Sequence, residues 1–203
     1  MKITSIKQQQ KRLDRYSIFI DEKYTFSLGE DDLVSSGLHK GQEVTEADLI
    51  KYKQDSLVGK AYDRAIRYLA LRPRSKWEIE DYLKRKNYDE PVIIAVIEKV
   101  TAKGYIDDDK FARSWIESRQ LLNPRSKKRL HFELKKKHIS DVVIDQVISE
   151  IGEEIEISQI ETIIHKKRKA KRYQDNQKLL AYLARQGYSY DLIKRALESS
   201  GVV

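Results

Sequence analysis

One stretch of sixteen residues occurs twice in the chain, and this repeat most constrains what the chain can fold into. Residues 71–86 read LRPRSKWEIEDYLKRK and residues 122–137 read LNPRSKKRLHFELKKK, with eight identical positions at a constant offset of 51. In each copy a Pro-Arg-Ser-Lys turn precedes apolar residues at helical spacing. Self-similarity at a fixed period predicts tandem units, each too small to bury its apolar face alone.

Apolar residues at helical spacing on both sides of the turn predict a unit of three helices. Ser75 and Glu78 have the spacing of a capping box, Pro91 suits the first turn of a third helix, and Gly104 suits its left-handed stop. The apolar positions of the first unit are Ala61, Ala65, Leu69, Ile79, Leu83, Ile93, Val96, Ile97 and Val100. Those of the second unit are Ala112, Ile116, Leu130, Leu134, Ile144, Val147 and Ile148.

A third copy follows the second at an offset near 49. It keeps the apolar positions Leu179, Leu183, Ile193 and Leu197. There Asp175 takes the capping position, and the Pro-Arg-Ser turn is absent. We therefore expect a third unit of the same plan with a different turn.

The start of the chain has the period of strands. Residues 15–20 and 24–28 alternate apolar and other residues, and the three residues between them read as a hairpin turn. Residues 2–6 form a plausible third strand, and residues 30–38 predict a short helix that ends near Gly37. Helical periodicity begins after Thr45, where a capping box with Asp in place of Glu is expected.

These patterns predict a mainly α protein: tandem three-helix repeats in an elongated array, with a small β-containing N-terminal head. We expect the hairpin-containing head at residues 1–58 and the three repeats at 59–109, 110–152 and 153–203. The chain is 35% charged and has a mean hydropathy of −0.66, which favours small units with narrow apolar faces over one thick globule.

Charge is distributed unevenly. The net charge is +8, yet residues 1–59 hold nine basic and ten acidic side chains, so the excess lies in the helical part. A basic surface attracts nucleic acid, acidic proteins or nucleoprotein assemblies, although a lysine-rich solvated helix face is the plain alternative. The chain has no cysteine and no apolar run typical of a signal peptide or a membrane span. We therefore expect a soluble cytoplasmic protein.

The basic residues of the repeated turns are the first candidates for partner binding. A cation beside a helix N-terminus opposes the helix dipole and costs roughly a few tenths of a kcal/mol, so helix stability does not account for it. Its recurrence favours a surface for a negatively charged partner, to which free N–H groups would add. These candidates are Arg72, Arg74, Lys76, Arg125, Lys127, Lys128 and Arg129.

Two further basic groups complete the candidate set. Lys135 and Lys136 lie in the last turn of the second repeated helix, where cations also favour the dipole. The densest run has six basic residues in the seven positions 166–172, and we take Lys166, Lys167, Arg168 and Lys169 as candidates. On a helix this run would cover most of the circumference. It is either a phosphate-facing segment or an extended solvated helix between units.

No catalytic, cofactor or metal site is expected from the sequence. The three aspartates 107–109 follow a glycine stop and precede a helix, so capping explains them better than a metal does. The four histidines have no pairing at i, i+3 or i+4, and the chain has no Gly-rich phosphate loop and no Gly-x-Ser-x-Gly elbow. Trp115 reads as packing, while Trp77 could cover the turn or offer an aromatic contact to a partner.

Two stretches carry a resemblance to a known family. They are RYLALRPRSKWEIEDYLKRK at residues 67–86 and VIEKVTAKGYIDDDKFARSWIESR at residues 96–119, and the order Gly-Tyr-Ile-Asp-Asp at 104–108 before Phe111-Ala112 is the most telling part. These stretches resemble the RecX family, bacterial regulators of the RecA recombinase. The resemblance covers residues 60–152 well, whereas the third repeat and the head resemble more variable regions of the family.

The resemblance implies a slightly bowed helical protein without catalytic residues, which lies in the groove of the RecA–DNA filament. Such proteins block filament extension or promote disassembly. They lower the ATPase, strand-exchange and co-protease activities of the recombinase in DNA repair and the SOS response. We expect a monomer that contacts several recombinase subunits, and direct contact with single- or double-stranded DNA stays open. The repeated basic turns could present the same contact at successive places along the filament.

Two other functions remain open from the residues alone. A turn before a basic helix superficially resembles a helix-turn-helix module, so the chain could bind DNA without sequence preference and without any recombinase. The near-neutral head could also make the protein a plain scaffold for another protein. Steep salt dependence on bare DNA would favour the DNA-binding function.

Overall fold

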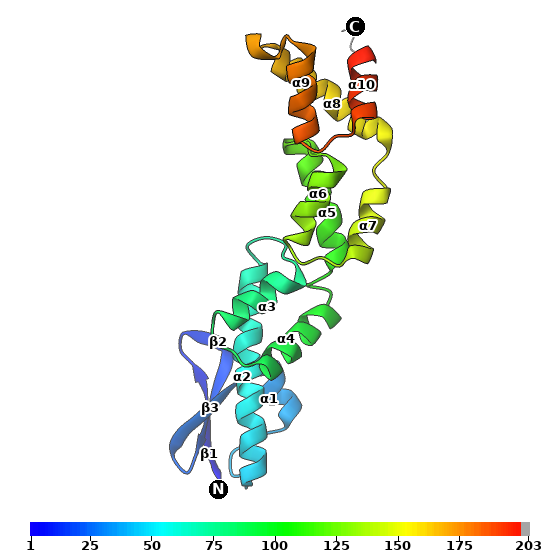
Figure 1. Cartoon of the computed structure of the whole chain (residues 1–203). Helices are drawn as coiled ribbons and strands as arrows, with labels where there is room; N and C mark the ends of the chain where they lie inside the picture. The colour runs from blue at the N-terminus through cyan, green and yellow to red at the C-terminus, as the bar shows by residue number, and fades with distance from the viewer. Residues whose placement is uncertain (200–203) are drawn as a thin grey trace. The chain divides into compact units, whose positions relative to one another are not determined.

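The computed structural model describes residues 1–199, and Figure 1 draws the arrangement of its helices and strands. The chain divides into two compact units, of which the first comprises Met1–Ile106 and the second begins at Asp107. The first unit holds the head and the first repeat. The second holds the other two repeats.

The head is an antiparallel sheet of three strands in the order β1-β2-β3. The strands are β1 (Ile3–Gln9), β2 (Arg12–Ile20) and β3 (Lys23–Gly29). Asp21 and Glu22 form the turn between β2 and β3 with φ of 47° and 66°, the left-handed pair that a two-residue hairpin needs. All three predicted strands are therefore present, and their inner face buries Ile3, Ile18 and Phe26.

Helix α1 (Glu30–Ser36) ends at Gly37, whose φ of 64° is the left-handed stop expected there. Helix α2 (Glu46–Leu69) begins with the expected capping box between Thr45 and Asp48. It runs without a break across residue 58, where the sequence suggested a boundary. The head is held to α2 by a short ion pair, in which Arg15 Nη1 lies 2.6 Å from Asp63 Oδ2.

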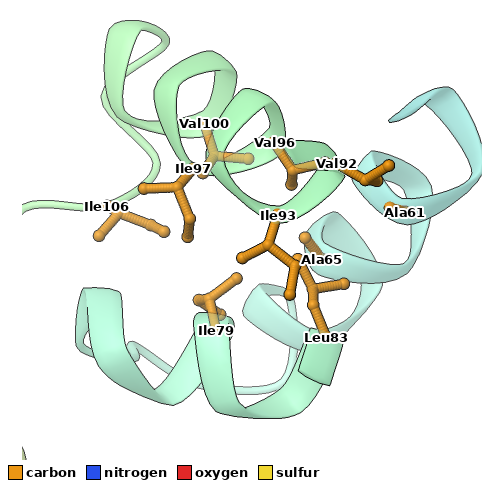
Figure 2. Packing of buried hydrophobic residues seen from close by; sticks show 10 residues of the cluster. All are labelled: Ala61, Ala65, Ile79, Leu83, Val92, Ile93, Val96, Ile97, Val100 and Ile106. Carbon is orange, nitrogen blue, oxygen red and sulfur yellow. The ribbon is translucent and has the colours of Figure 1, made fainter. Parts of the chain in front are cut away.

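The first three-helix unit consists of the later part of α2 with α3 (Lys76–Lys84) and α4 (Glu90–Ala102). Figure 2 shows the side chains of its core pointing toward one another from the three helices. Ile79, Leu83 and Ile93 are at most 2% exposed, and each fully buried side chain of this size stabilises the fold by about 1.5–3 kcal/mol. The predicted stop at Gly104 is present, with φ of 71°.

The second three-helix unit repeats this plan with α5 (Asp108–Leu122), α6 (Lys127–Lys135) and α7 (Asp141–Ser149). The third has α8 (Glu153–Arg168), the 3-10 turn η1 (Lys171–Tyr173), α9 (Asn176–Arg185) and α10 (Tyr190–Ser199). Asp107, Ser140 and Asp175 cap α5, α7 and α9 through their side chains. The predicted fold class, tandem three-helix units behind a small β-containing head, is confirmed. Their extension into an elongated array stays a prediction.

The structure contradicts one of the two interpretations of the basic run at residues 166–172. The prediction of an extended helix between units is wrong, because α8 ends at Arg168 and the chain then forms η1. The run lies inside the third unit, between its first and second helices. Arg168 helps to close this turn, since its Nη1 donates to the carbonyl of Gln174 at 2.9 Å.

Within residues 1–199, no helix is both long and apolar enough to cross a bilayer. The same residues contain no group of three His, Asp or Glu side chains that could hold a metal ion.

Candidate functional site

The first basic turn is held by a network around Glu78. Ser75 Oγ accepts from the Glu78 N–H at 3.3 Å, and Glu78 Oε2 accepts from the Ser75 N–H at 3.2 Å. Arg72 Nη2 donates to Glu78 Oε1 at 2.8 Å, and this hydrogen bond raises the pKa of Arg72. Arg72 thus stabilises the turn while 43% of its side chain stays exposed.

The Arg74 guanidinium lies over the ring of Tyr68, which is one of a stacked aromatic pair. Its guanidinium carbon is 3.6 Å from the centroid of the Tyr68 ring, and Tyr68 stacks on Tyr82 with centroids 4.1 Å apart. This cation–π stack orients the guanidinium at the edge of α3. Lys76 is exposed and Trp77 is half-buried beside it. The first turn therefore displays a fixed guanidinium and an exposed ammonium.

The second basic turn packs against the third three-helix unit. Ser126 is 1% exposed, and its Oγ donates to the carbonyl of Gln186 at 2.7 Å. Gly187 adopts φ of 92°, and a Cβ there would lie 2.7 Å from Ser126 Oγ. Only glycine permits this approach without a shift.

Lys127 takes part in the same joint between units. The second turn has Arg129 at the position where the first has Glu78, so it lacks its own capping carboxylate. Glu156 of α8 supplies one: its Oε1 accepts from the Lys127 N–H at 3.2 Å, and its Oε2 lies 3.6 Å from Lys127 Nζ. Glu156 is 5% exposed. Both the backbone N–H and the ammonium of Lys127 are thus engaged by the third three-helix unit.

The aromatic pair of the first three-helix unit is replaced by an ion pair in the second three-helix unit. Arg119 and Glu133 stand at the positions of Tyr68 and Tyr82, 51 residues later. Arg119 Nε donates to Glu133 Oε2 at 2.7 Å, and Trp115 Nε1 donates to the same oxygen at 3.0 Å. Burial alone would raise the pKa of Glu133, but these hydrogen bonds outweigh it and hold the pKa below its ordinary value.

The remaining predicted residues divide into engaged and exposed cations. Lys135 Nζ donates to Asp141 at 2.7 Å, and Lys136 Nζ lies 4.5 Å from the centroid of the Phe132 ring. Lys167 Nζ lies 4.7 Å from the centroid of the Tyr182 ring. Lys135 and Lys136 stay exposed despite these contacts, and Lys128, Arg129, Lys166 and Lys169 are exposed as well, with Arg129 Nη1 donating to Gln186 Oε1 at 3.4 Å.

Three of the predicted cations meet at one groove. Arg125, Lys166 and Lys167 line a groove of about 840 Å³ between the second and third three-helix units, which belong to the same compact unit. The first-turn candidates Arg72, Arg74 and Lys76 belong to the other compact unit.

Sequence reasoning missed the polar and apolar lining of this groove. Gln159 and Tyr188 line it and are 8% and 4% exposed, and burial raises the pKa of Tyr188 to about 12. Leu121 and Leu122 also line it, and both are exposed. Two adjacent leucines at the end of a charged helix were the one available signal in the sequence.

Family models match the head and each of the three repeats. The head matches "Regulatory protein RecX N-terminal domain" at residues 1–45. The repeats match the first, second and third three-helix domains of RecX at residues 61–99, 107–148 and 154–197.

Curated relatives match over nearly the whole chain. Regulatory protein RecX of Bacillus subtilis is 33% identical over 97% of this chain and 76% of the relative. That of Listeria monocytogenes serotype 4a is 36% identical over 97% of this chain and 74% of the relative. The chain belongs to the RecX family.

Solved RecX structures agree with the fold. A crystal structure of regulatory protein RecX superposes with a TM-score of 0.80 at 25% identity, covering 96% of this chain and 98% of the other. RecX from Lactobacillus salivarius gives a TM-score of 0.65 over 72% of this chain and 98% of the other, a likeness of fold at 23% identity. RecX is a regulatory family with a helical repeat fold and is not a known family of enzymes.

Proposed function

We propose that this protein binds in the groove of the RecA–DNA filament. There it inhibits the ATPase, strand-exchange and co-protease activities of the recombinase. Membership of the RecX family over nearly the full chain supports a regulatory role in recombination and carries this proposal. The protein acts in the cytoplasm as a monomer without catalytic residues of its own.

The charge distribution supports a polymeric, negatively charged partner. Both compact units display cations that are at least partly exposed: Arg72 and Lys76 on the first, Lys128 and Lys166 on the second. Each exposed contact is weak by itself, because solvent and salt screen it. Contacts made by two linked units with one filament strengthen binding multiplicatively, since the second contact becomes intramolecular.

A binding comparison tests this proposal. Fluorescently labelled protein is titrated with recombinase filaments on single-stranded DNA, and separately with the same DNA alone at the same salt concentration. We expect much tighter binding to the filament than to bare DNA. Equal affinity for both would overturn the proposal.

One observation favours direct DNA binding as the second candidate. The basic run at 166–172 lies beside Tyr173 and Tyr182, whose rings are 5.4 Å apart at their centroids. Cations next to aromatic rings suit a sequence-tolerant single-stranded DNA contact. If this is the function, affinity for bare DNA falls steeply as salt rises, with a slope set by the number of phosphates neutralised.

A further inference from the structure

We infer that the groove between the second and third three-helix units binds a short peptide segment of the partner protein, one that carries apolar side chains beside a carboxylate. This inference rests on the proposed function, because it places the segment on the recombinase.

Apolar side chains on the groove wall are exposed to solvent. Leu121, Leu122 and Ile155 line the groove and are 77%, 82% and 44% exposed. They come from the end of α5 and the start of α8, so they belong to two different repeats. An apolar partner side chain seated between them would remove leucine surface from water on both sides, which a phosphate backbone cannot do.

Buried polar atoms in the groove lack hydrogen-bond partners. Within residues 1–199, Arg125 Nε, Gln159 Oε1 and Tyr188 Oη are buried without one, although Arg125 Nε lies 3.9 Å from Glu133 Oε1. An unpaired buried polar group is costly, and a bound ligand can complete it. A peptide backbone offers both N–H donors and carbonyl acceptors, so it can satisfy the Gln159 oxygen as well as the Tyr188 hydroxyl.

The positive charge of the groove lining favours binding of an acidic peptide segment. Arg125, Lys166 and Lys167 line the groove against a single acidic lining residue, Glu154. A carboxylate on the peptide would be attracted to the three cations, and a basic peptide would be repelled. The leucines and the unpaired acceptor favour a peptide over nucleic acid, for which the cations alone would suffice.

The inference is tested with overlapping fifteen-residue peptides that span the recombinase sequence, each labelled with fluorescein. The full chain is titrated into each peptide, and binding is measured by fluorescence anisotropy. We expect binding by a segment that places Asp or Glu beside Leu, Ile or Phe. Leu122→Glu should weaken this binding by about tenfold or more, because burying one leucine side chain accounts for at least that factor. Lys166→Glu should weaken it through charge.

Val142→Glu is the matched control. Val142 is 77% exposed on α7, in the same compact unit, but does not line the groove. Its variant should bind the peptide as the wild type does. All three variants change exposed side chains, so circular dichroism melts should remain unchanged and exclude unfolding as the cause.

The inference is overturned if no peptide binds the wild type, or if Leu122→Glu binds as tightly as Val142→Glu. Displacement of the bound peptide by oligothymidylate at equal concentration would assign the groove to nucleic acid instead. Recombinase ATPase inhibition by the wild type is measured in parallel. Inhibition without peptide binding rejects the groove inference alone, whereas absence of inhibition rejects the proposed function.

Discussion

Glu156 does for α6 what Glu78 does for α3, although it comes from a different helix. Glu78 accepts from the N–H of its own capping serine at 3.2 Å, and Glu156 accepts from the Lys127 N–H at the same distance across the joint between units. A carboxylate at a helix N-terminus accepts a hydrogen bond from a backbone N–H that has no partner within the helix. Its negative charge also interacts favourably with the helix dipole. The N-terminus of α6 therefore receives its carboxylate through a tertiary contact with α8.

Glu156→Ala should destabilise the second compact unit by about 1–3 kcal/mol, because it leaves a partly buried N–H and Lys127 without their acceptor. The chain has two tryptophans, Trp77 in the first compact unit and Trp115 in the second. Trp115 fluorescence in a Trp77→Phe background therefore follows urea unfolding of the second unit alone. Glu154→Ala removes an exposed charge from the same turn of α8 and is the control. Equal effects of both changes would contradict the capping role.

Gly187→Ala should cost more than Gly104→Ala. Both glycines adopt left-handed φ, at 92° and 71°, so alanine is strained in each by about 1 kcal/mol. Only at Gly187 would the new Cβ also lie 2.7 Å from Ser126 Oγ, whereas nothing lies within 4 Å at Gly104. Thermal melts of the two variants, followed by the tryptophan in each unit, compare the costs. Equal costs would mean that the Ser126 contact is unimportant.

Helix ends are the elements that the sequence predicted best. Thr45, Ser75 and Asp175 cap their helices as expected, because capping depends on residues within one turn of the chain. The role of Ser126 could not be predicted in full, since its bond to Gln186 joins residues 60 positions apart. The sequence shows Arg129 in place of a capping carboxylate, but it does not show that Glu156 of α8 takes that place.

Ser126→Ala should destabilise the second compact unit more than Ser140→Ala does. Each change removes a side-chain cap worth about 1 kcal/mol. Ser126→Ala also leaves the Gln186 carbonyl without its donor, which adds roughly another 1 kcal/mol. Urea unfolding followed at Trp115 in a Trp77→Phe background measures both losses. A larger loss for Ser140→Ala would contradict the contact described between the second and third repeats.

The Asp175 cap predicts acid sensitivity of the third unit. Backbone N–H groups of Lys178 and Gln177 donate to Asp175 and hold its pKa below the ordinary value. Because the folded pKa is the lower one, the cap contributes its stability above the unfolded pKa of about 4 and loses it as pH falls through the folded pKa. Asp175→Asn keeps a capping oxygen that does not titrate. The stability of the wild type relative to this variant should therefore fall below about pH 4, and a constant difference would contradict the assignment.

For the whole molecule, periodicity identified the three repeats and the head but not how neighbouring parts are joined. The burial of Ser126 is a tertiary fact that no local pattern encodes. For the same reason, the sequence did not show which of the predicted cations make contacts between repeats and which are exposed. Lys127 contacts Glu156 of the third repeat, whereas Lys76 and Lys128 are exposed.

If both compact units contact one filament, charge reversals on the two units should combine. Lys76→Glu and Lys128→Glu should each weaken filament binding by about fivefold, or roughly 1 kcal/mol, and their losses should add in free energy. Lys11→Glu makes the same charge change on the exposed surface of the head and should have little effect. Equal weakening by all three variants would indicate a response to net charge instead of defined contacts.

The most direct test of the central claim is recombinase ATPase on single-stranded DNA, titrated with this protein. A filament regulator that acts on many subunits should inhibit the ATPase at well below one molecule per recombinase monomer, at a salt concentration where it binds bare DNA weakly. ATPase activity that stays unchanged up to equimolar protein, together with salt-sensitive binding to DNA alone, would contradict the account.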